Sequence, residues 1–259
     1  MPLFGRKKSR SSSSSSSSGT LDFSEVKLGK AVGAGRSGST FSAHWNGRHV
    51  AAKVVDLSAA SKKSLANELL KELRREEEVA SALRHPNIVQ FLGSTSAPPR
   101  YCLVFEFMEG GTLTALVRAK SKAPLDFFRL ANDMAQGHGQ DLGLWPQLCH
   151  GSWPLGRPNG RDGHADVYSF AVVMWELLAK DIPFKGQTPM QTAMAVAEHQ
   201  MRPALPRNTP PKIAELIEHC WNQDPTRRPD FSAIVKVLPF VKQTLSKTDF
   251  KNAGILYTA

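Results

Sequence analysis

Residues 28–57 read LGKAVGAGRSGSTFSAHWNGRHVAAKVVDL, and this stretch decides the fold. Its strand formers, residue types that favour extended conformation, are Val32, Thr40, Phe41, Val50, Val54 and Val55. The dipeptide Asn46-Gly47 lies between two such runs and is the strongest short signal for a two-residue hairpin turn. The stretch therefore predicts antiparallel strands joined by tight turns.

Three glycines ahead of that hairpin, Gly33, Gly35 and Gly38, have the spacing G-x-G-x-x-G. In a dinucleotide-binding domain the third glycine opens a helix, whereas here it leads into more strand. A glycine-rich turn between strands brings backbone N–H groups close to phosphate oxygens, because no Cβ stands in the way. On this motif alone, a flexible hairpin without a ligand is an equally good interpretation.

A single lysine, Lys53, interrupts the apolar run VAAKVV at residues 50–55. A lysine among buried valines is costly unless an anion neutralises it. The next segment, residues 64–84, has the period of a helix, and Glu76 falls on its apolar stripe. The other members of that stripe are Leu69, Leu73, Ala80 and Leu83. We therefore expect Lys53 and Glu76 to pair; the alternative is that Glu76 belongs to the charged run RREEE and faces solvent.

The remaining chain changes from strand to helix. Two more apolar strands are predicted over residues 87–93 and 101–108. Helical patterns then fill 112–119, 125–136, 166–179, 188–199, 210–222 and 230–245. Such segregation predicts an α+β fold with two lobes, a sheet with one helix over residues 21–109 and a mainly helical lobe over 110–245. Residues 246–259 are set apart as a C-terminal tail.

Taken together, these segments resemble a protein kinase domain of the tyrosine-kinase-like (TKL) Ser/Thr group. GAGRSGST, VAAK, Glu76 and LRHPNIV look like the small lobe of that family, and LVFEFMEGGTL looks like the hinge between its lobes. RLANDMAQG, DVYSFAVVMWELL and HCWNQDPTRRPDF resemble successive helical motifs of the large lobe. The likeness covers about residues 22–137 and 164–245.

The resemblance implies ATP and Mg²⁺ as cofactors, and transfer of the γ-phosphoryl group to a protein hydroxyl, Ser/Thr more than Tyr. Lys53 would then hold the phosphates, and Glu76 would hold Lys53. Phe105 stands at the gatekeeper position, and Thr40 replaces the valine that usually covers the adenine. The implied nucleotide contacts are Val32, Gly33, Gly35, Gly38, Thr40, Ala51, Lys53, Phe105, Glu106 and Met108.

Residues 138–163 depart from the family. They contain six Gly, three Pro and two Trp, and they show no helical or strand period. The family has a longer segment here, with H-R-D-x-x-x-x-N supplying the catalytic base and a metal ligand, and this motif does not occur in the sequence. Asp141 in D-L-G-L resembles the metal-binding Asp of D-F-G. Asp166 is interpreted as a cap or anchor of the following helix, because Ala171 stands where the Asn would be required.

The aberrant segment leaves several alternatives open. It is either a splicing or frameshift artefact of the gene model or a true deletion. No A-P-E motif is present, so we expect Arg228 to lack the Glu that pairs with it in the family. As written, the chain is expected to be impaired in phosphoryl transfer. The alternatives are a pseudokinase that binds nucleotide or acts as a scaffold, and a chain that does not fold stably.

Composition limits the other classes of function. The first 20 residues carry four basic residues and eight consecutive serines, which predicts a disordered tail. The net charge is +10, but the basic residues of the folded part are scattered, so no nucleic-acid partner is expected. Three dispersed cysteines and the lack of a signal sequence or membrane span favour the cytoplasm, with the nucleus as a further possibility.

Overall fold

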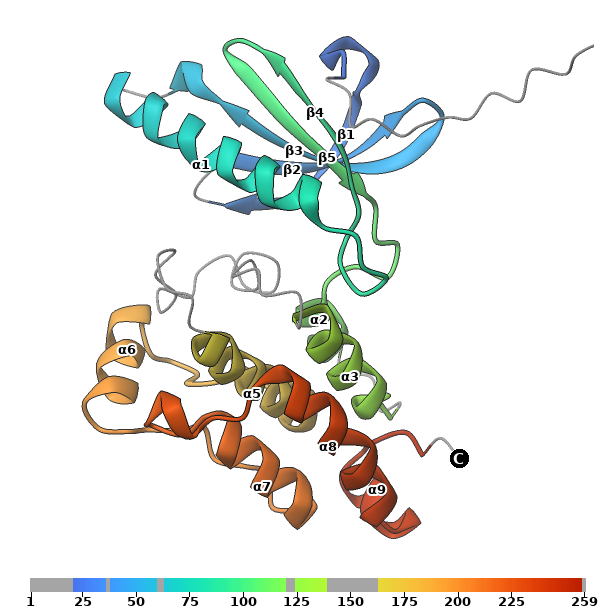
Figure 1. The fold of residues 1–259 in the computed structure, drawn as a ribbon, viewed down its shortest axis with the longest axis vertical. Coiled ribbons are helices and arrows are strands. Elements are labelled where there is room, and N and C mark those ends of the chain that lie inside the picture. The colour runs from blue at the N-terminus through green and yellow to red at the C-terminus, as the bar shows by residue number, and fades with distance from the viewer. Residues whose placement is uncertain (1–20, 36–37, 60–62, 120–123, 139–162, 258–259) are drawn as a thin grey trace, which may run out of the picture.

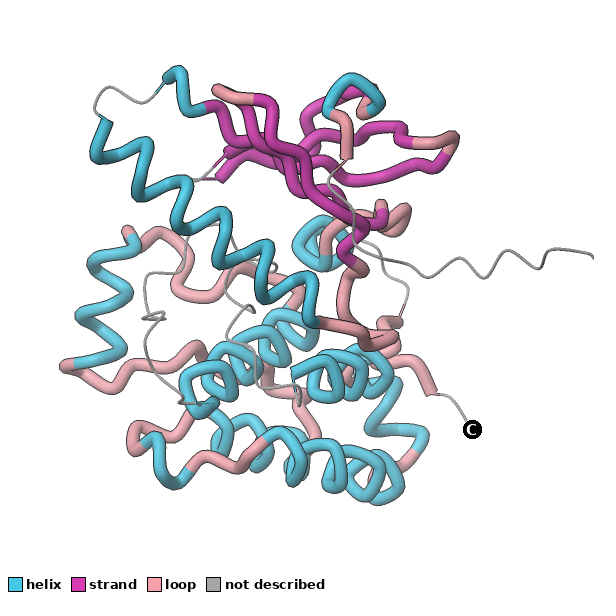
Figure 2. The backbone as a smooth tube through the Cα atoms, turned by 45° about the horizontal axis from the view of Figure 1, so that its top comes forward, coloured by secondary structure: helices cyan, strands magenta, loops and turns pink. Residues whose placement is uncertain are grey.

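The computed structural model describes residues 21–35, 38–59, 63–119, 124–138 and 163–257 of the 259-residue chain. The strands and one long helix form the upper lobe in Figure 1, and the other helices gather below them. Figure 2 shows the same division, with the strands at one end of the molecule. The predicted α+β architecture with two lobes is confirmed.

The upper lobe contains a five-stranded antiparallel sheet with the order β1-β2-β3-β5-β4. Its strands are β1 (Lys27–Gly35), β2 (Gly38–Trp45), β3 (Arg48–Asp56), β4 (Phe91–Ala97) and β5 (Arg100–Glu106). Asn46 and Gly47 make the predicted hairpin between β2 and β3, with φ values of 49° and 73°. Both values are positive, as the turn type that matches the twist of a hairpin requires.

Side chains of β3 alternate between the two faces of the sheet. Val50, Ala52 and Val54 pack with Cys102 in one apolar cluster. Val55 lies in a second cluster, together with residues of α1 (Lys63–Ala82), the helix that crosses the sheet in Figure 1. Because strand residues alternate with a period of two, Lys53 faces the same side as Val55. This alternation directs the lysine toward α1.

The position of β4 differs from the prediction. The apolar pattern indicated a strand over residues 87–93, but β4 spans Phe91–Ala97. Ile88 donates its N–H to the carbonyl oxygen of His85, so residues 85–88 form a turn after α1. The strand begins once that turn is complete, and it pairs with β5 as far as Ala97.

The lower lobe is helical. Its helices are α2 (Leu113–Arg118), α3 (Phe127–His138), α5 (Gly163–Ala179), α6 (Pro189–Ala197), α7 (Pro211–Cys220), α8 (Phe231–Thr244) and α9 (Lys247–Asn252). Short 3₁₀ turns lie at Phe23–Glu25, Leu57–Ala59 and Pro225–Arg227. Helix α5 carries apolar side chains on all its faces, and its residues Phe170, Ala171 and Met174 are fully buried. A helix that is apolar all round lies inside a core, and α5 is the centre of this lobe.

The last described residues pack onto the lower lobe, although the sequence analysis sets residues 246–259 apart as a tail. Phe250 of α9 is 2 % exposed and belongs to the lobe's core. Ile255 forms a parallel bridge with Leu125, which lies just before α3. Residues 246–257 therefore complete this lobe.

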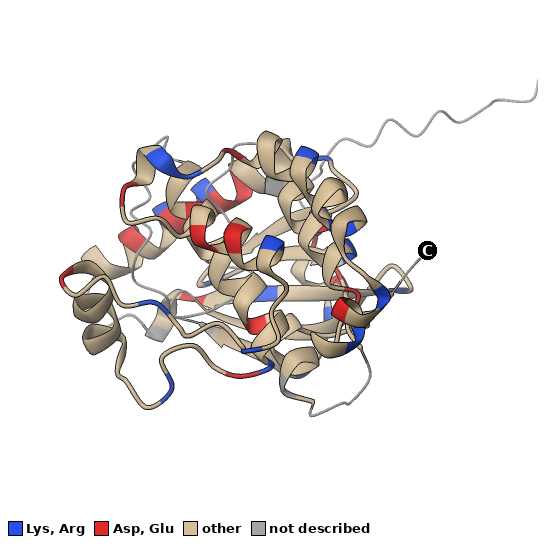
Figure 3. Ribbon diagram, turned by 90° about the horizontal axis from the view of Figure 1, so that it is seen from below, with Lys and Arg blue, Asp and Glu red and all other residues tan. Residues whose placement is uncertain are grey.

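The charged side chains are spread over the molecule. In Figure 3, Lys and Arg occur on several elements, with Asp and Glu among them. Within the part of the chain that the structure describes, no helix is both long enough and apolar enough to cross a membrane.

Candidate nucleotide site

The structure brings Lys53 and Glu76 together. The Nζ atom of Lys53 lies 2.5 Å from Oε2 of Glu76, across 23 residues of sequence. Their side chains are 19 % and 20 % exposed, so the pair is largely shielded from water. The solvent-facing alternative for Glu76 is therefore excluded.

The apolar stripe of α1 positions Glu76. Leu73 and Ala80, three residues before it and four after it, are buried against Val55 and Leu103 of the sheet. Residues with these spacings share one face of a helix, so burial of Leu73 and Ala80 turns Glu76 toward the sheet as well. The pair thus follows from two local patterns, the alternation of β3 and the stripe of α1.

Strand register aligns the glycine-rich strand with Lys53. Gly33 pairs with Thr40, Thr40 pairs with Lys53, and Lys53 pairs with Leu103. Directly opposed residues of neighbouring strands point to the same face, so Thr40 and Lys53 lie side by side. Ala51 and Phe105 form the next opposed pair on that face.

The glycines of this region differ in what surrounds them. Gly38 has a φ of 152°, and a Cβ there would lie 2.4 Å from the carbonyl oxygen of Val54, so packing against β3 requires a glycine. A Cβ on Gly33 would meet only the Cβ of Thr40, at 3.9 Å. Packing within the protein therefore explains Gly38 but not Gly33. Gly35 pairs with Gly38 at the end of the hairpin, whose two connecting residues lie outside the described part.

The remaining candidate contacts lie along β1 and the connection between the lobes. Val32 and Met108 are 51 % and 53 % exposed. Glu106 donates its N–H to the carbonyl oxygen of Gln90 at 2.9 Å, and its carboxylate accepts the N–H of Gln90 at 2.7 Å. These bonds tie the end of β5 to the segment before β4, and they leave the Glu106 carbonyl as its candidate ligand group.

A histidine that the sequence analysis missed also supports the connection between the lobes. Nδ1 of His49 lies 2.6 Å from Oε1 of Glu109, and its Nε2 lies 2.8 Å from Oγ of Ser42. The ring stacks on Phe107, with 3.9 Å between the ring centroids. His49 therefore links β3 to the chain that leaves the sheet. Its position beside a hairpin gave no signal of this contact.

Arg228 contacts several groups of the lower lobe. Its Nε donates to the carbonyl oxygen of Asn222 at 2.7 Å, and its Nη1 donates to that of His164 at 2.8 Å. The guanidinium also lies over the ring of Tyr168, 5.2 Å from its centroid. Backbone carbonyl oxygens and an aromatic ring therefore contact Arg228, while the A-P-E motif whose Glu pairs with this arginine in the family is absent from the sequence.

Two aspartates were considered in this lobe. Asp166 lies in the first turn of α5, which begins at Gly163, three residues earlier than the pattern indicated. An acidic residue there interacts favourably with the positive end of the helix dipole, in agreement with a structural role. Asp141, the candidate metal ligand, lies outside the described residues, as does most of the aberrant segment 138–163.

Comparison with known proteins gives two family matches. A model described as "Protein kinase domain" matches residues 26–136, and one described as "Protein tyrosine and serine/threonine kinase" matches residues 160–238. The two matches leave residues 137–159 uncovered. That gap coincides with the segment that the sequence analysis found to be aberrant.

Several curated proteins are similar over most of the chain. The serine/threonine/tyrosine-protein kinase HT1 of Arabidopsis thaliana is 33 % identical, over 85 % of this chain and 67 % of the relative. The serine/threonine-protein kinase STY46 of the same plant is 29 % identical, over 84 % and 44 %. The probable serine/threonine-protein kinase drkC of Dictyostelium discoideum is 30 % identical, over 84 % and 35 %. This chain thus spans less than half the length of the latter two.

The length of the first alignment is informative. It extends over 264 residues but includes only 85 % of this 259-residue chain. The relative therefore contains residues within the aligned region that this chain lacks.

Proposed function

The chain belongs to the protein kinase family, in its tyrosine-kinase-like group, and from this membership we propose that it binds ATP but transfers the γ-phosphoryl group poorly. The protein kinase family implies use of ATP and a protein substrate. The residues expected to bind ATP and the residues expected to catalyse phosphoryl transfer lie in different parts of this sequence.

The observation that supports binding is the Lys53–Glu76 pair beside the glycine-rich strand. A shielded ammonium held by a carboxylate is a fixed positive charge, which the phosphates of ATP can approach. Gly33 lies in register with Thr40 and Lys53, and the protein does not fill the space at its missing Cβ. We propose that backbone N–H groups near Gly33 and Gly35 contact the phosphates, and that Lys53 neutralises them.

The adenine is proposed to lie against the same face of the sheet. Val32, Thr40 and Ala51 supply small or apolar side chains there, and Phe105 limits the depth of the site. The Glu106 carbonyl and the backbone of Met108 are the proposed polar contacts. Each of these residues precedes the aberrant segment in sequence, so that segment supplies none of the proposed contacts.

The residues that could hold Mg²⁺ are less complete than those proposed to bind ATP. The kinase family implies this metal, but the described residues contain no group of three or more His, Cys, Asp and Glu side chains placed to hold an ion. The sequence also lacks the Asn of the catalytic loop. The described residues do not form a complete metal site, and Asp141 lies outside them, so we derive no step through the metal.

Transfer is proposed to be impaired because the general base is missing. No H-R-D-x-x-x-x-N motif occurs in the sequence, and Asp166 is held in the first turn of α5. A positioned base typically contributes about 10²- to 10⁴-fold to a rate. The protein is therefore proposed to act as a nucleotide-binding or scaffold module, unlike a family member that phosphorylates Ser or Thr.

A second possibility concerns the encoded protein. Family similarity stops at residue 136 and resumes at residue 160, which supports the proposal that kinase sequence has been lost between them. Sequencing the transcript across codons 137–164 tests it. An alternative exon or frame that encodes the missing motif would identify an active kinase, and a continuous transcript without one would establish a true deletion.

Thermal unfolding with ATP tests the proposed binding. A ligand at 100 times its Kd stabilises the folded state by about 2.7 kcal/mol, so millimolar ATP should raise the Tm by several degrees. Lys53→Met should abolish the shift. Absence of a shift in a chain that unfolds cooperatively contradicts ATP binding, and absence of a cooperative transition indicates a chain that does not fold stably.

Radiolabelled ATP tests the proposed loss of transfer. The purified protein should leave a generic substrate such as myelin basic protein unlabelled above background. Labelling that disappears in Lys53→Met would contradict the proposal and assign kinase activity to this chain.

A further inference from the structure

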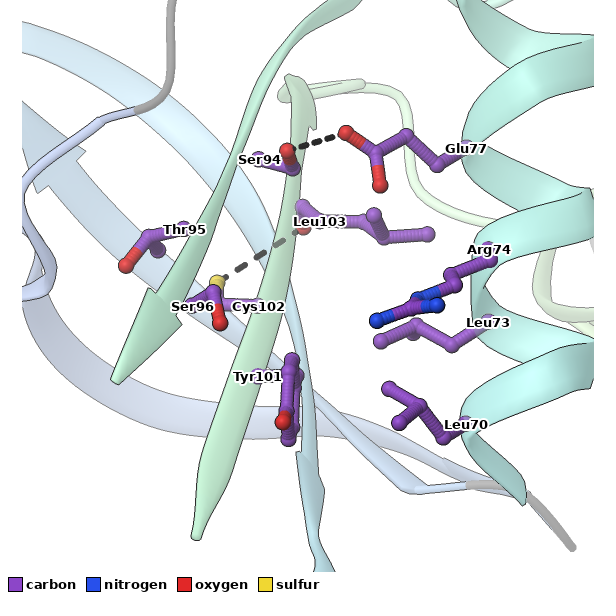
Figure 4. A pocket seen from close by; sticks show the side chains of 10 residues that line it. All are labelled: Leu70, Leu73, Arg74, Glu77, Ser94, Thr95, Ser96, Tyr101, Cys102 and Leu103. Carbon is purple, nitrogen blue, oxygen red and sulfur yellow. Dashed lines mark hydrogen bonds between the residues drawn. The ribbon is translucent and has the colours of Figure 1, made fainter. Parts of the chain in front are cut away.

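A second polar contact attaches α1 to the sheet. The hydroxyl of Ser94 in β4 donates a hydrogen bond to Oε1 of Glu77, the residue that follows Glu76. Figure 4 shows this bond bridging the space between β4 and α1. Glu77 and Ser94 are both partly buried, so the bond is partly protected from competition with water.

The two contacts of α1 point in different directions. Successive residues of an α-helix are separated by about 100° around its axis. Glu76 meets Lys53 on β3, whereas Glu77 meets Ser94 on β4. With a single polar contact, the rotation of the helix would depend on its apolar packing alone. Two contacts in different directions fix that rotation.

Apolar packing is incomplete where this bond lies. A pocket of about 210 Å³, partly open to solvent, lies between α1 and strands β4 and β5, and its walls include Leu70, Arg74, Glu77, Ser94 and Tyr101. Figure 4 shows these side chains around the space. The open pocket itself contributes few dispersion contacts between α1 and the sheet. The Ser94–Glu77 bond connects the two across this part of the interface.

We propose that Ser94 and Glu77 are positioning residues, which set the rotation of α1 and so keep Glu76 in contact with Lys53. Neither residue needs to touch nucleotide. The proposal depends on the proposed function only for the consequence that ATP binding weakens when the pair separates.

Chemical labelling of Lys53 tests the positioning without nucleotide. A lysine amine reacts with an acetylating ester faster when it is not held in an ion pair, and mass spectrometry measures the rate at Lys53. Glu76→Gln sets the rate for a broken pair. Ser94→Ala and Glu77→Leu should each increase labelling at least threefold toward that rate. Wild-type rates in both variants, with Glu76→Gln labelled faster, would overturn the proposal.

Conservative variants separate positioning from general damage. Glu77→Gln keeps an oxygen that accepts the Ser94 hydroxyl, and Ser94→Thr keeps the hydroxyl, with the neighbouring pocket available to its methyl group. Both should label like the wild type. Glu78→Leu is the matched control, since Glu78 is adjacent and exposed. Labelling of Glu78→Leu at the rate of Glu77→Leu would contradict a specific role for Glu77.

The shift in Tm with ATP provides the second readout. Ser94→Ala and Glu77→Leu should reduce the shift, and Ser94→Thr should preserve it. If the wild type shows no shift but the labelling pattern holds, the positioning stands and the proposed nucleotide function fails. If ATP stabilises all variants equally and labelling is unchanged, the positioning fails and nucleotide binding stands.

Discussion

Gly38 of β2 lies so close to β3 that a Cβ in its place would be 2.4 Å from the carbonyl oxygen of Val54. This approach allows the glycine-rich hairpin to continue directly into the strand pair that carries Lys53. The same hairpin contains Gly33, which no such contact explains, so substitutions at Gly38 and Gly33 can be compared experimentally.

Gly38→Ala should destabilise the protein. The added methyl would meet a backbone atom that cannot move aside easily. In addition, residues other than glycine rarely adopt a φ of 152°. The free energy of unfolding should fall by about 2–3 kcal/mol. Urea denaturation measures this change, and a loss below about 0.5 kcal/mol would show that the strand pair relaxes freely.

Gly33→Ala should behave differently, because its Cβ would meet only Thr40 at 3.9 Å. Stability should change by less than about 1 kcal/mol. ATP binding should nevertheless weaken if phosphates approach this position. Fluorescence titration with a labelled ATP analogue checks this, and unchanged affinity would place the phosphates elsewhere.

Lys53→Met and Glu76→Leu should be strongly coupled. Either single change leaves a charge that is largely shielded and unpaired, whereas the double change removes both. Each single variant should lose about 1–3 kcal/mol of unfolding free energy, and the double variant should lose about 1–2 kcal/mol less than their sum. Additive losses in urea denaturation would show that the two side chains do not interact energetically.

Arg228→Lys should reduce stability although it keeps the charge. A lysine cannot reach the two carbonyl oxygens and the Tyr168 ring with the planar fork of arginine. We expect a loss of about 1–3 kcal/mol. Arg227→Lys is the control, because that side chain is 76 % exposed and its change should cost less than about 0.5 kcal/mol. Equal effects would mean that the contacts of Arg228 contribute nothing specific.

Asp230→Asn should alter the pH dependence of stability. The N–H of Ala233, followed by the Ser232 hydroxyl, holds the pKa of the Asp230 carboxyl below its ordinary value of 3.8. Because the folded pKa is lowered, this stabilisation is fully present above about pH 3.8 and is lost as the pH falls through the folded value. Asn also caps helices well, so the two proteins should be similar at pH 7.

Thermal unfolding from pH 7 to pH 2.5 checks this prediction. The stability of the wild type relative to Asp230→Asn should decrease only below about pH 4. A difference that stays constant across the range would show that the carboxyl does not interact more strongly in the folded state.

Local patterns were sufficient to predict much of the upper lobe. The Asn46-Gly47 turn has the expected positive φ values, and Glu76 lies on the stripe of α1 opposite Lys53. These features follow from strong periods and from the cost of burying a charge. Six of the described helices of the lower lobe were also predicted to within a few residues from their apolar patterns, whereas α9 was not predicted.

Other features depend on contacts between distant residues, which a single sequence does not show. Because a turn follows His85, β4 begins four residues later than the start that the apolar pattern predicted. Arg228 donates to the backbone carbonyl oxygens of Asn222 and His164, contacts that no sequence pattern indicated. Glu77 lies in the charged run RREEE, and only its spacing of four residues from Leu73 is consistent with a position facing the sheet. No sequence pattern indicated Ser94 as its partner.

The bridge between Leu125 and Ile255 has a consequence for synthesis on the ribosome. All five strands and α1 lie within residues 27–106, so the upper lobe has its complete set of contacts early in translation. The lower lobe remains open until Phe250 and Ile255 have left the exit tunnel, because both belong to its core. We therefore expect the upper lobe to fold before the lower lobe during synthesis. The lower lobe should then need chaperones for the longer time.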